Sequence, residues 1–442
     1  MKNELRIVLL LLCLCPLMHL SGQNTLLALE DMHTVSKGET WESIAASYGV
    51  SVVELQAANP DVKKKKLKKR TLLIIPKKVL LEHVTEVPAK PVPVIRTSLA
   101  DLKVGVLLPF GDKKMVEFYR GFLMAADSVR KSGVNLDIHA WDCGSTTSQI
   151  ESLLPKLGGM DVLFGPSSST QIPAVAEVCR EQGIRLVLPF WEGQTTQDYP
   201  LVYNATASNS VLFEAAVRKL ISYYADRNFV VVRSGKNDVR GQMFTQTLSR
   251  NMVQQSGTQR VLELEGDDFA YESAFNQFRG NMVFLDDSNV RSLNILLARL
   301  KEFRQKHPDY RISLIGYPEW QDETGRLLDD FFTFDTYVFS PYYYNVFDDR
   351  TKHFQRTYEK SFRTPIAQDN PRFAAMGFDL GYYFMSGISS LGDTFEQMQG
   401  GLQQEPYQNR YQFERSAAGM SFTNSFVQFI HFMPGKKIEL IR

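Results

Sequence analysis

The sequence predicts an α/β protein in which a small βααβ module precedes two doubly wound lobes, each built on a parallel sheet. Three observations lead to this fold class. Residues 33–76 hold a complete strand, helix, helix, strand pattern. A Pro-containing segment follows, and from residue 101 onward buried strands alternate with amphipathic helices. Such alternation requires crossover helices that cover the faces of a parallel sheet.

The start of the chain has the pattern of a signal peptide. MKNELR supplies a basic start, IVLLLLCLCPLMHL is an apolar stretch, and Ser21-Gly22 offers small residues before Gln23. A membrane anchor is the competing interpretation. However, the apolar stretch is shorter than the roughly 18–20 residues of a spanning helix, and Pro16 and His19 interrupt it. We therefore expect residues 1–22 to be cleaved and the protein to be exported to the periplasm or cell envelope.

Charge and cysteine content exclude some function classes. The chain has 50 Lys and Arg against 49 Asp and Glu, a net charge of +1. Nucleic-acid-binding domains normally have a large basic excess, so we expect no nucleic-acid partner. After signal removal only Cys143 and Cys179 remain, which is compatible with one disulfide in an oxidising compartment. We expect them to stay unpaired, because the predicted fold places them toward opposite edges of one sheet.

The small module can be read element by element. His33-Thr34-Val35 is a short extended start, and Thr40 is positioned to cap a helix over residues 41–48. Ser51 and Glu54 form a capping box for a second helix, which ends at Asn59-Pro60 because Pro cannot prolong it. Residues 71–75 are the closing strand.

This module resembles the LysM family through "HTVSKGETWESIAASYGVS", the "ANP" after helix two and the final "LLIIP". The resemblance implies non-catalytic binding to glycans that contain N-acetylglucosamine, in bacteria the peptidoglycan strands. It places the sugar between two loops, at Gly38, Glu39, Thr40 and Trp41 on one side and Asn59, Pro60, Asp61 and Val62 on the other. Three of these residues have a structural alternative: Trp41 as a core residue, Thr40 as a cap and Asn59 as part of a helix stop.

Residues 78–100 are predicted to be a linker, stiffened by Pro88, Pro91 and Pro93. The large domain covers residues 101–442. Its predicted strands are 104–108, 136–141, 161–164, 185–189, 229–233, 282–285 and 312–315. Its predicted helices are 115–131, 148–157, 170–182 and 293–307, followed by a helical stretch over 351–388 and a hairpin over 426–442. We assign residues 101–208 and 341–400 to lobe one, and residues 209–340 and 401–442 to lobe two.

The large domain resembles the type I periplasmic binding proteins, in their branched-chain amino-acid receptor branch. The resembling stretches, in order, are "KVGVLLPF", "DVLFGPSSS", "LIGYPEW" and "FQRTYEKSFRTPIAQDNPRFAAMGFDLGYYF". The resemblance implies a ligand cleft between the lobes, at the carboxyl ends of the strands. The cleft residues that we expect are Phe110, Asp142, Ser167, Ser168, Ser169, Trp191 and Glu192 from lobe one, and Ser234, Asp286, Tyr317 and Glu319 from lobe two.

The expected cleft agrees only in part with an amino-acid receptor. Ser167 to Ser169 keep the hydroxyl and amide groups that bind a carboxylate in that family. The next loop is normally small, whereas Phe190-Trp191-Glu192 brings two bulky rings and a negative charge. Glu319 is the nearest match to the carboxylate that holds the ligand ammonium. We therefore expect an altered pocket, in which Trp191, Tyr317 and Trp320 either stack on a sugar ring or muropeptide or simply pack.

The sequence offers no activated group for catalysis. Its His residues lack the spacing of a metal pair or a nucleophile motif, and it has no phosphate-binding loop or dinucleotide signature. We expect neither enzymatic activity nor a cofactor or metal.

Three functions remain, and the first is favoured. It is an exported protein that binds peptidoglycan and senses a small-molecule or muropeptide ligand, a cell-wall synthase or another envelope protein through its two lobes. The alternative is a solute receptor that delivers amino acids or small peptides to a membrane transporter. A cell-wall hydrolase ranks third.

Overall fold

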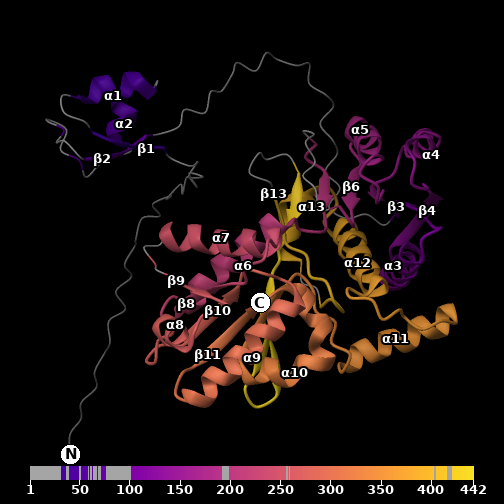
Figure 1. Cartoon of the computed structure of the whole chain (residues 1–442). Helices are drawn as coiled ribbons and strands as arrows, with labels where there is room; N and C mark the ends of the chain where they lie inside the picture. Colours follow the sequence, from indigo (N-terminus) through magenta and orange to yellow (C-terminus); the bar gives the residue numbers. More distant parts are fainter. Residues whose placement is uncertain are drawn as a thin grey trace, which may run out of the picture. The chain divides into compact units, whose positions relative to one another are not determined.

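The protein is described from a computed structural model (Figure 1), which covers residues 31–35, 39–48, 51–57, 59, 62, 67, 71–75, 101–191, 199–254, 257, 259–402, 405–415 and 421–442. The chain divides into two compact units, Met1–Pro93 and Val94–Arg442. The predicted signal peptide over residues 1–22 and the whole predicted linker over 78–100 lie outside the described residues.

The small unit has the strand, helix, helix, strand order that the sequence predicts. Its elements are β1 (Asp31–Thr34), α1 (Trp41–Tyr48), α2 (Val52–Ala57) and β2 (Leu72–Ile75). The two strands pair antiparallel, with Asp31 opposite Ile75 and Thr34 opposite Leu72. The buried core consists of Val35, Trp41, Ile44, Ala45, Leu55 and Leu73.

Lobe one of the large unit is built on a mixed, mostly parallel sheet with the strand order β13-β14-β7-β6-β5-β3-β4. Its strands are β3 (Asp101–Leu108), β4 (Asn135–Asp142), β5 (Val162–Phe164), β6 (Arg185–Leu188), β7 (Val202–Asn204), β13 (Phe413–Arg415) and β14 (Phe422–Asn424). Its helices are α3 (Lys113–Lys131), α4 (Thr147–Glu151), η1 (Leu154–Lys156), α5 (Ile172–Gln182), α11 (Asp349–Phe362), α12 (Phe373–Leu391), η3 (Gly392–Thr394), α13 (Phe395–Met398) and η4 (Gln399–Gly401).

Lobe two has a second sheet of the same kind, with the strand order β16-β15-β12-β11-β10-β8-β9. Its strands are β8 (Asn228–Arg233), β9 (Gln259–Glu263), β10 (Asn281–Leu285), β11 (Ile312–Gly316), β12 (Thr336–Ser340), β15 (Gln428–Met433) and β16 (Lys437–Ile441). Its helices are α6 (Asn209–Tyr224), α7 (Val239–Gln254), α8 (Asp268–Ala274), α9 (Val290–Lys306), η2 (Pro318–Glu323) and α10 (Thr324–Thr333). In Figure 1, α6 and α7 lie on the opposite side of this sheet from α9 and α10.

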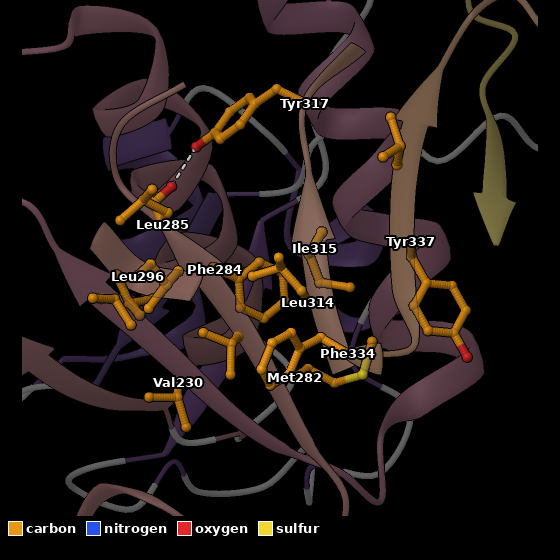
Figure 2. Close-up of a cluster of buried hydrophobic side chains, with 14 of the residues drawn as sticks. Val230, Met282, Phe284, Leu285, Leu296, Leu314, Ile315, Tyr317, Phe334 and Tyr337 are labelled. Carbon is orange, nitrogen blue, oxygen red and sulfur yellow. Dashed lines mark hydrogen bonds between the residues drawn. The ribbon is translucent and has the colours of Figure 1, made fainter. Parts of the chain in front are cut away.

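The strands form where the sequence has short, continuous apolar runs, which suit a sheet covered on both faces. Every residue of β10, β11 and β12 is buried. Figure 2 shows part of the resulting core, with Val230, Met282, Phe284 and Leu314 from three neighbouring strands and Leu296 from α9. These elements confirm the predicted two-lobed α/β fold.

In the described part of the large unit, the backbone passes between the lobes through three connections, residues 205–208, 341–348 and 425–427. This arrangement differs from the predicted lobe boundaries in one place. Residues 401–442 were expected in lobe two, but β14 pairs parallel with β7 and therefore extends the sheet of lobe one. The strands β13 and β14 have three residues each, and so short an apolar pattern does not allow them to be assigned to a sheet from the sequence.

Two predicted helices are also shorter than expected. The helix over 148–157 ends at Glu151 and continues only as the 3₁₀ turn η1, which has Pro155 in its first turn. The stretch over 351–388 is two helices, α11 and α12, separated by residues 363–372, which contain Pro365 and Pro371. Proline lacks a backbone N–H and disfavours helix at the residue before it, so both interruptions have a local cause.

The two cysteines of the described residues are free thiols, as expected, although Cys143 and Cys179 lie in one apolar cluster of lobe one. Burial raises the pKa of Cys143 to about 11 and that of Cys179 to about 12. Neither thiolate is therefore populated at neutral pH, which makes both groups chemically inert.

Candidate functional site

The loop before α1 in the small unit combines a helix cap with exposed polar groups. The N–H of Ser43 donates to Thr40 Oγ1 (3.2 Å) and the N–H of Thr40 donates to Ser43 Oγ (2.9 Å), which is a reciprocal cap of α1. This confirms the predicted capping role of Thr40. The side chain of Thr40 is exposed and that of Glu39 is half-buried, so both remain accessible to a ligand.

Trp41 and Asn59 are buried in the small unit. Trp41 is only 4% exposed and packs in the core with Ile44 and Leu73. Asn59 Nδ2 donates to the carbonyl of Leu55 at 2.8 Å, which satisfies an orphan acceptor at the end of α2. Both residues therefore support the loops structurally. Val62 is half-buried against the core, while Gly38, Pro60 and Asp61 lie outside the described residues.

In lobe one, the carboxylate of Asp142 connects two strand ends. Asp142 Oδ1 accepts hydrogen bonds from the N–H of Phe110 (3.2 Å) and of Gly144 (3.1 Å), so it fixes the loops after β3 and β4 to each other. The ring of Phe110 packs edge-to-face on Tyr119, with centroids 5.1 Å apart. Asp142 and Phe110 thus both have structural partners at the edge of the sheet where the cleft was predicted.

The serines expected at the cleft lie in the loop between β5 and α5. Ser167 and Ser168 are half-buried and Ser169 is exposed. Ser168 Oγ is 3.0 Å from Thr170 Oγ1, and the carbonyl of Ser168 accepts the N–H of Gln171. The contact of this loop with a ligand stays a prediction, and of its three serines only Ser169 is exposed.

Gln171 is a buried positioning residue that the sequence did not single out. Its side chain is fully buried, and Nε2 donates to the carbonyls of Cys143 (2.8 Å) and Thr146 (2.9 Å). It therefore joins the loop after β4 to the loop after β5. A Gln at the entrance of a helix gives no pattern that could have revealed this contact.

The bulky rings after β6 fill space within lobe one. Phe190 packs against Phe118 and Phe373, with ring centroids 5.0 and 5.9 Å away. Trp191 is half-buried against the cluster around α5, and its indole Nε1 is buried and has no hydrogen-bond partner among the described residues. Glu192 lies outside the described residues. Phe190 thus packs within lobe one, and Trp191, expected at the cleft either to stack on a ligand or to pack, lies half-buried against this cluster.

Of the cleft residues expected from lobe two, Tyr317 is placed differently from the prediction. It is fully buried, and its hydroxyl donates to the carbonyl of Leu285 at 2.6 Å (Figure 2). Trp320 is 1% exposed and its Nε1 donates to the carbonyl of Ser288. A fully buried ring offers no face to a ligand, so the expected contact of Tyr317 with a ligand is corrected to a core role.

Asp286 and Ser234 form a second strand-end contact. The N–H of Ser234 donates to Asp286 Oδ1 at 2.7 Å, which ties the loop after β8 to the end of β10. Asp286 is 9% exposed and lines a hollow of about 460 Å³ between α7 and the strands β8 and β9. That hollow does not include Glu319, so these two predicted site residues do not share a pocket.

Glu319 is paired within its own lobe. Arg240 Nη1 donates to Glu319 Oε1, and both side chains are about one-third exposed. Burial raises the pKa of Glu319, and the charge of Arg240 lowers it to a smaller extent. A ligand ammonium would have to compete with this guanidinium, because the carboxylate already has a cationic partner.

Glu319 lines a hollow of about 650 Å³ at the carboxyl ends of the lobe-two strands. Loops after β8, β10 and β11 contribute its walls, and acidic groups outnumber basic ones. Its charged lining residues are Lys236, Asp238, Asp287, Arg291, Glu319, Asp322 and Glu323.

All five acids of this hollow have partners in the structure, and those of Asp238 and Asp322 bear on its shape. Burial alone would raise the pKa of Asp238, but N–H donors from Ser288, Gly241 and Arg240 outweigh it and hold the pKa below its ordinary value. Asp322 Oδ1 accepts a hydrogen bond from Asn370 Nδ2 of lobe one at 2.8 Å. The edge of the hollow is therefore a point of direct contact between the lobes.

The comparisons with known proteins match the small unit to a domain family and the large unit to a known fold. Residues 33–76 match the LysM domain family. These residues are a LysM domain. No curated protein sequence matches the chain.

Three solved structures that are similar to the chain each match 77% of it. A putative branched-chain amino acid ABC transporter from Rhodospirillum rubrum is 14% identical, is covered completely and has a TM-score of 0.54. An ABC transporter substrate-binding protein from Desulfitobacterium hafniense in complex with Leu is 16% identical, is covered completely and has a TM-score of 0.45. A branched-chain amino acid periplasmic ligand-binding protein from Burkholderia xenovorans LB400 is 11% identical, is 94% covered and has a TM-score of 0.48.

The large unit, which follows the LysM domain in the sequence, thus has the bilobal fold of type I periplasmic binding proteins. Because the sequence identities are this low, the similarity concerns the fold alone. The LysM domain implies glycan binding. Within the described residues, no group of three or more His, Cys, Asp and Glu side chains could hold a metal ion. None of the described helices combines the length and the apolar character required to span a membrane.

Proposed function

We propose that the protein is a non-catalytic component of the cell envelope that binds peptidoglycan through its LysM domain and senses a ligand or partner with its bilobal unit. The observation that carries the proposal is the match of residues 33–76 to the LysM family together with the βααβ arrangement of the same residues. Export to the periplasm or cell envelope follows from this proposal, because peptidoglycan lies there.

The LysM groove is proposed to lie between the loop before α1 and the loop after α2. N-acetyl groups offer an amide for hydrogen bonds and a methyl group for an apolar notch. Exposed Thr40 and half-buried Glu39 and Val62 supply these two kinds of contact. Several weak contacts are sufficient when the ligand is a repeating polymer, because rebinding raises the effective concentration.

The test is co-sedimentation of the full-length protein with purified sacculi, compared with a variant that lacks residues 31–77. We expect the intact protein to pellet and the shortened one to stay in solution. Val53→Ser is a matched control within the domain, because Val53 is 77% exposed on α2 and belongs to neither loop. If the intact protein fails to pellet, peptidoglycan is not its ligand.

The bilobal unit is proposed to take a ligand other than a free amino acid. The Glu319 carboxylate already forms an ion pair with Arg240, and Tyr317 is buried in the core. Phe190 packs where a receptor of this fold was expected to have small residues. A muropeptide or a protein such as a cell-wall synthase fits the proposed attachment to the wall.

A solute receptor is the second candidate, favoured by the shared fold with the transporter protein from Rhodospirillum rubrum. Thermal unfolding in the presence of amino acids, dipeptides and muropeptides separates the two. A ligand at 100 times its dissociation constant adds roughly 2.7 kcal/mol to folded-state stability, which gives a clear shift. A shift with amino acids supports the receptor, whereas a shift with muropeptides alone supports the sensor.

A further inference from the structure

The buried carboxylate of Asp379 has no part in the site described above. It lies on α12, is 2% exposed, and belongs to the "GFD" stretch of the sequence. Oδ1 accepts the N–H of Tyr407 at 2.8 Å, and Oδ2 accepts the N–H groups of Gln408 (2.8 Å) and Asn409 (2.7 Å). Three backbone donors on one carboxylate fix the chain that carries them, here the segment 407–412.

Backbone hydrogen bonds link segment 407–412 to residues 341–348, one of the connections between the lobes. The N–H of Tyr343 donates to the carbonyl of Gln408 at 3.1 Å, and Tyr342 forms an antiparallel bridge with Asn409. This connection is therefore paired, through its backbone, with a segment that Asp379 holds on lobe one.

Hydrogen bonds through Asn424 link the same segment to the other two connections, residues 205–208 and 425–427. The side chain of Asn424 is also buried, with 2% exposed. Asn424 Oδ1 accepts the N–H of Gln412 (2.9 Å) and of Phe426 (3.1 Å), and Nδ2 donates to the carbonyl of Ala205 (3.2 Å). The N–H of Ser425 donates to the carbonyl of Gln412 at 2.8 Å. Segment 407–412 thus contacts all three connections, directly or through one side chain.

We propose that residues 407–412 are a shared clamp on the three connections between the lobes, and that the side-chain oxygens of Asp379 hold this clamp in place. Rotation of one lobe against the other requires backbone dihedral changes in the connections. Main-chain hydrogen bonds to the clamp resist such changes near lobe one. Release of the clamp therefore increases the range of lobe orientations.

The charge state of Asp379 makes the clamp sensitive to pH. Burial raises the pKa of Asp379 to about 7, whereas the N–H groups of Asn409, Tyr407 and Gln408 and the charge of Arg350 lower it. The other titratable groups that interact with it are Tyr344, Tyr407 and Tyr411.

The direction in which pH changes the stability of the closed clamp follows from proton linkage. A group whose pKa is higher in the closed clamp than in an open, hydrated one binds its proton more tightly when the clamp is closed. The ordinary pKa of an Asp is 3.8. The closed clamp is therefore most favourable below about pH 4, and it loses stability as pH rises from about 4 through about 7.

The test measures the distance distribution between spin labels on the two lobes of the full-length protein at pH 5 and pH 8. Exposed Lys156 and Gln305 are suitable labelling sites as Lys156→Cys and Gln305→Cys in a chain whose Cys13 and Cys15 are replaced by Ser, because Cys143 and Cys179 are buried. We expect the wild-type distribution to be broader at pH 8. Asp379→Asn, which cannot ionise, should give the same distribution at both pH values.

Asp349→Asn is the matched control, because this carboxylate is exposed at the start of α11 and should keep the wild-type pH response. Hydrogen exchange of the Tyr407, Gln408 and Asn409 amides, corrected for intrinsic rates, should increase with pH only where Asp379 is present. A wild-type distribution that is equally narrow at both pH values would overturn the proposal. So would an unchanged pH response in the folded Asp379→Asn variant.

Discussion

At the scale of single residues, burial separates structural roles from binding roles in ways that residue type does not reveal. Trp41 belongs to a stretch that resembles a glycan-binding loop, yet it contributes the largest side chain among the six buried core residues that the structure describes in this unit. A module of about 45 residues buries only a small share of its surface, so it depends strongly on each core side chain.

Substitution of Trp41 distinguishes the core role from a sugar platform. Trp41→Ala should cost roughly 3–5 kcal/mol, which exceeds what so small a domain can lose, and abolish both its folding and its sacculus binding. Trp41→Leu should keep the domain folded and its affinity within about threefold, because an aliphatic side chain refills most of the space. Amide hydrogen exchange and co-sedimentation measure the two effects. A folded Trp41→Leu domain that no longer binds would assign the indole to the glycan.

The half-buried pair Arg240–Glu319 gives a second prediction at this scale. Arg240→Met should lower the free energy of unfolding by about 1–2 kcal/mol, since it leaves a partly desolvated carboxylate without its partner. The loss should be larger at pH 8 than at pH 5. The reason is that burial already raises the pKa of Glu319, and a carboxyl group with a raised pKa destabilises the fold increasingly as it ionises.

Denaturant unfolding of Arg240→Met, Glu319→Gln and the double variant at both pH values measures the coupling. Arg326→Met is the control, because Arg326 makes a comparable pair with Glu323 but its side chain is 57% exposed. The control should cost less than about 0.5 kcal/mol. Equal losses for the two Arg variants would mean that the Arg240 pair is an ordinary surface pair.

Residue identity alone predicts the chemistry of a site better than its geometry. The acids Asp142 and Asp286 were expected to face a ligand, and both instead accept backbone N–H groups at strand ends. Glu319 is exposed to a hollow as expected, but its partner Arg240 was not anticipated, since 79 positions separate them in the sequence. Such contacts depend on tertiary packing and leave no local pattern.

At the scale of elements, the hydrophobic pattern predicted seven strands of the large unit and its terminal hairpin within one to three residues, because runs such as MVFL are buried on both faces. It did not predict the strands β7, β9, β12, β13 and β14. Strands β13 and β14 have three residues each and join lobe one only through β7. The predicted helical stretch over 351–388 included the loop between α11 and α12, although this loop contains two prolines.

The packing of α12 along α3 depends on two glycines and yields a third prediction. A Cβ atom at Gly121 would lie 1.8 Å from the carbonyl oxygen of Ala374, and one at Gly377 would lie 2.0 Å from that of Phe118. Because both clashes involve backbone atoms, Gly121→Ala and Gly377→Ala should each force the helices apart and cost about 3 kcal/mol or more.

Gly325→Ala is the matched control for this change. Gly325 also lies in a helix, α10, but a Cβ atom there meets no other atom within 4 Å. This substitution should be neutral or stabilising by up to about 1 kcal/mol, because Ala is the better helix former. Denaturant unfolding compares the three variants. A neutral Gly377→Ala variant would show that α3 and α12 are not packed as closely as described.

At the scale of the whole molecule, two units with separate hydrophobic cores follow one another in the chain. The division was predictable from the change between a compact βααβ pattern and a long α/β alternation. The identity of a ligand for the lobes could not be predicted in the same way, because it depends on which side chains remain exposed at the strand ends after packing. Fold similarity does not supply it either, since one fold serves many ligands.

The separate cores predict two independent unfolding transitions, and the last prediction uses them to assign ligands to units. At about 0.7 kcal/mol per residue, the LysM domain should contribute roughly 30 kcal/mol of unfolding enthalpy, and the bilobal unit roughly eight times as much. Calorimetry should therefore resolve a small and a large transition. Deletion of residues 31–77 should remove the small one and leave the midpoint of the large one unchanged within about 1 °C.

Chitooligosaccharides at 100 times their dissociation constant should then raise only the small transition, because a ligand stabilises only the cooperative unit that binds it. Amino acids or muropeptides that bind the lobes should raise only the large one. Trp41→Ala should eliminate the response to chitooligosaccharides without moving the large transition. If these sugars raised the large transition instead, the glycan site would lie on the bilobal unit, and the LysM domain would not be what attaches the protein to the wall.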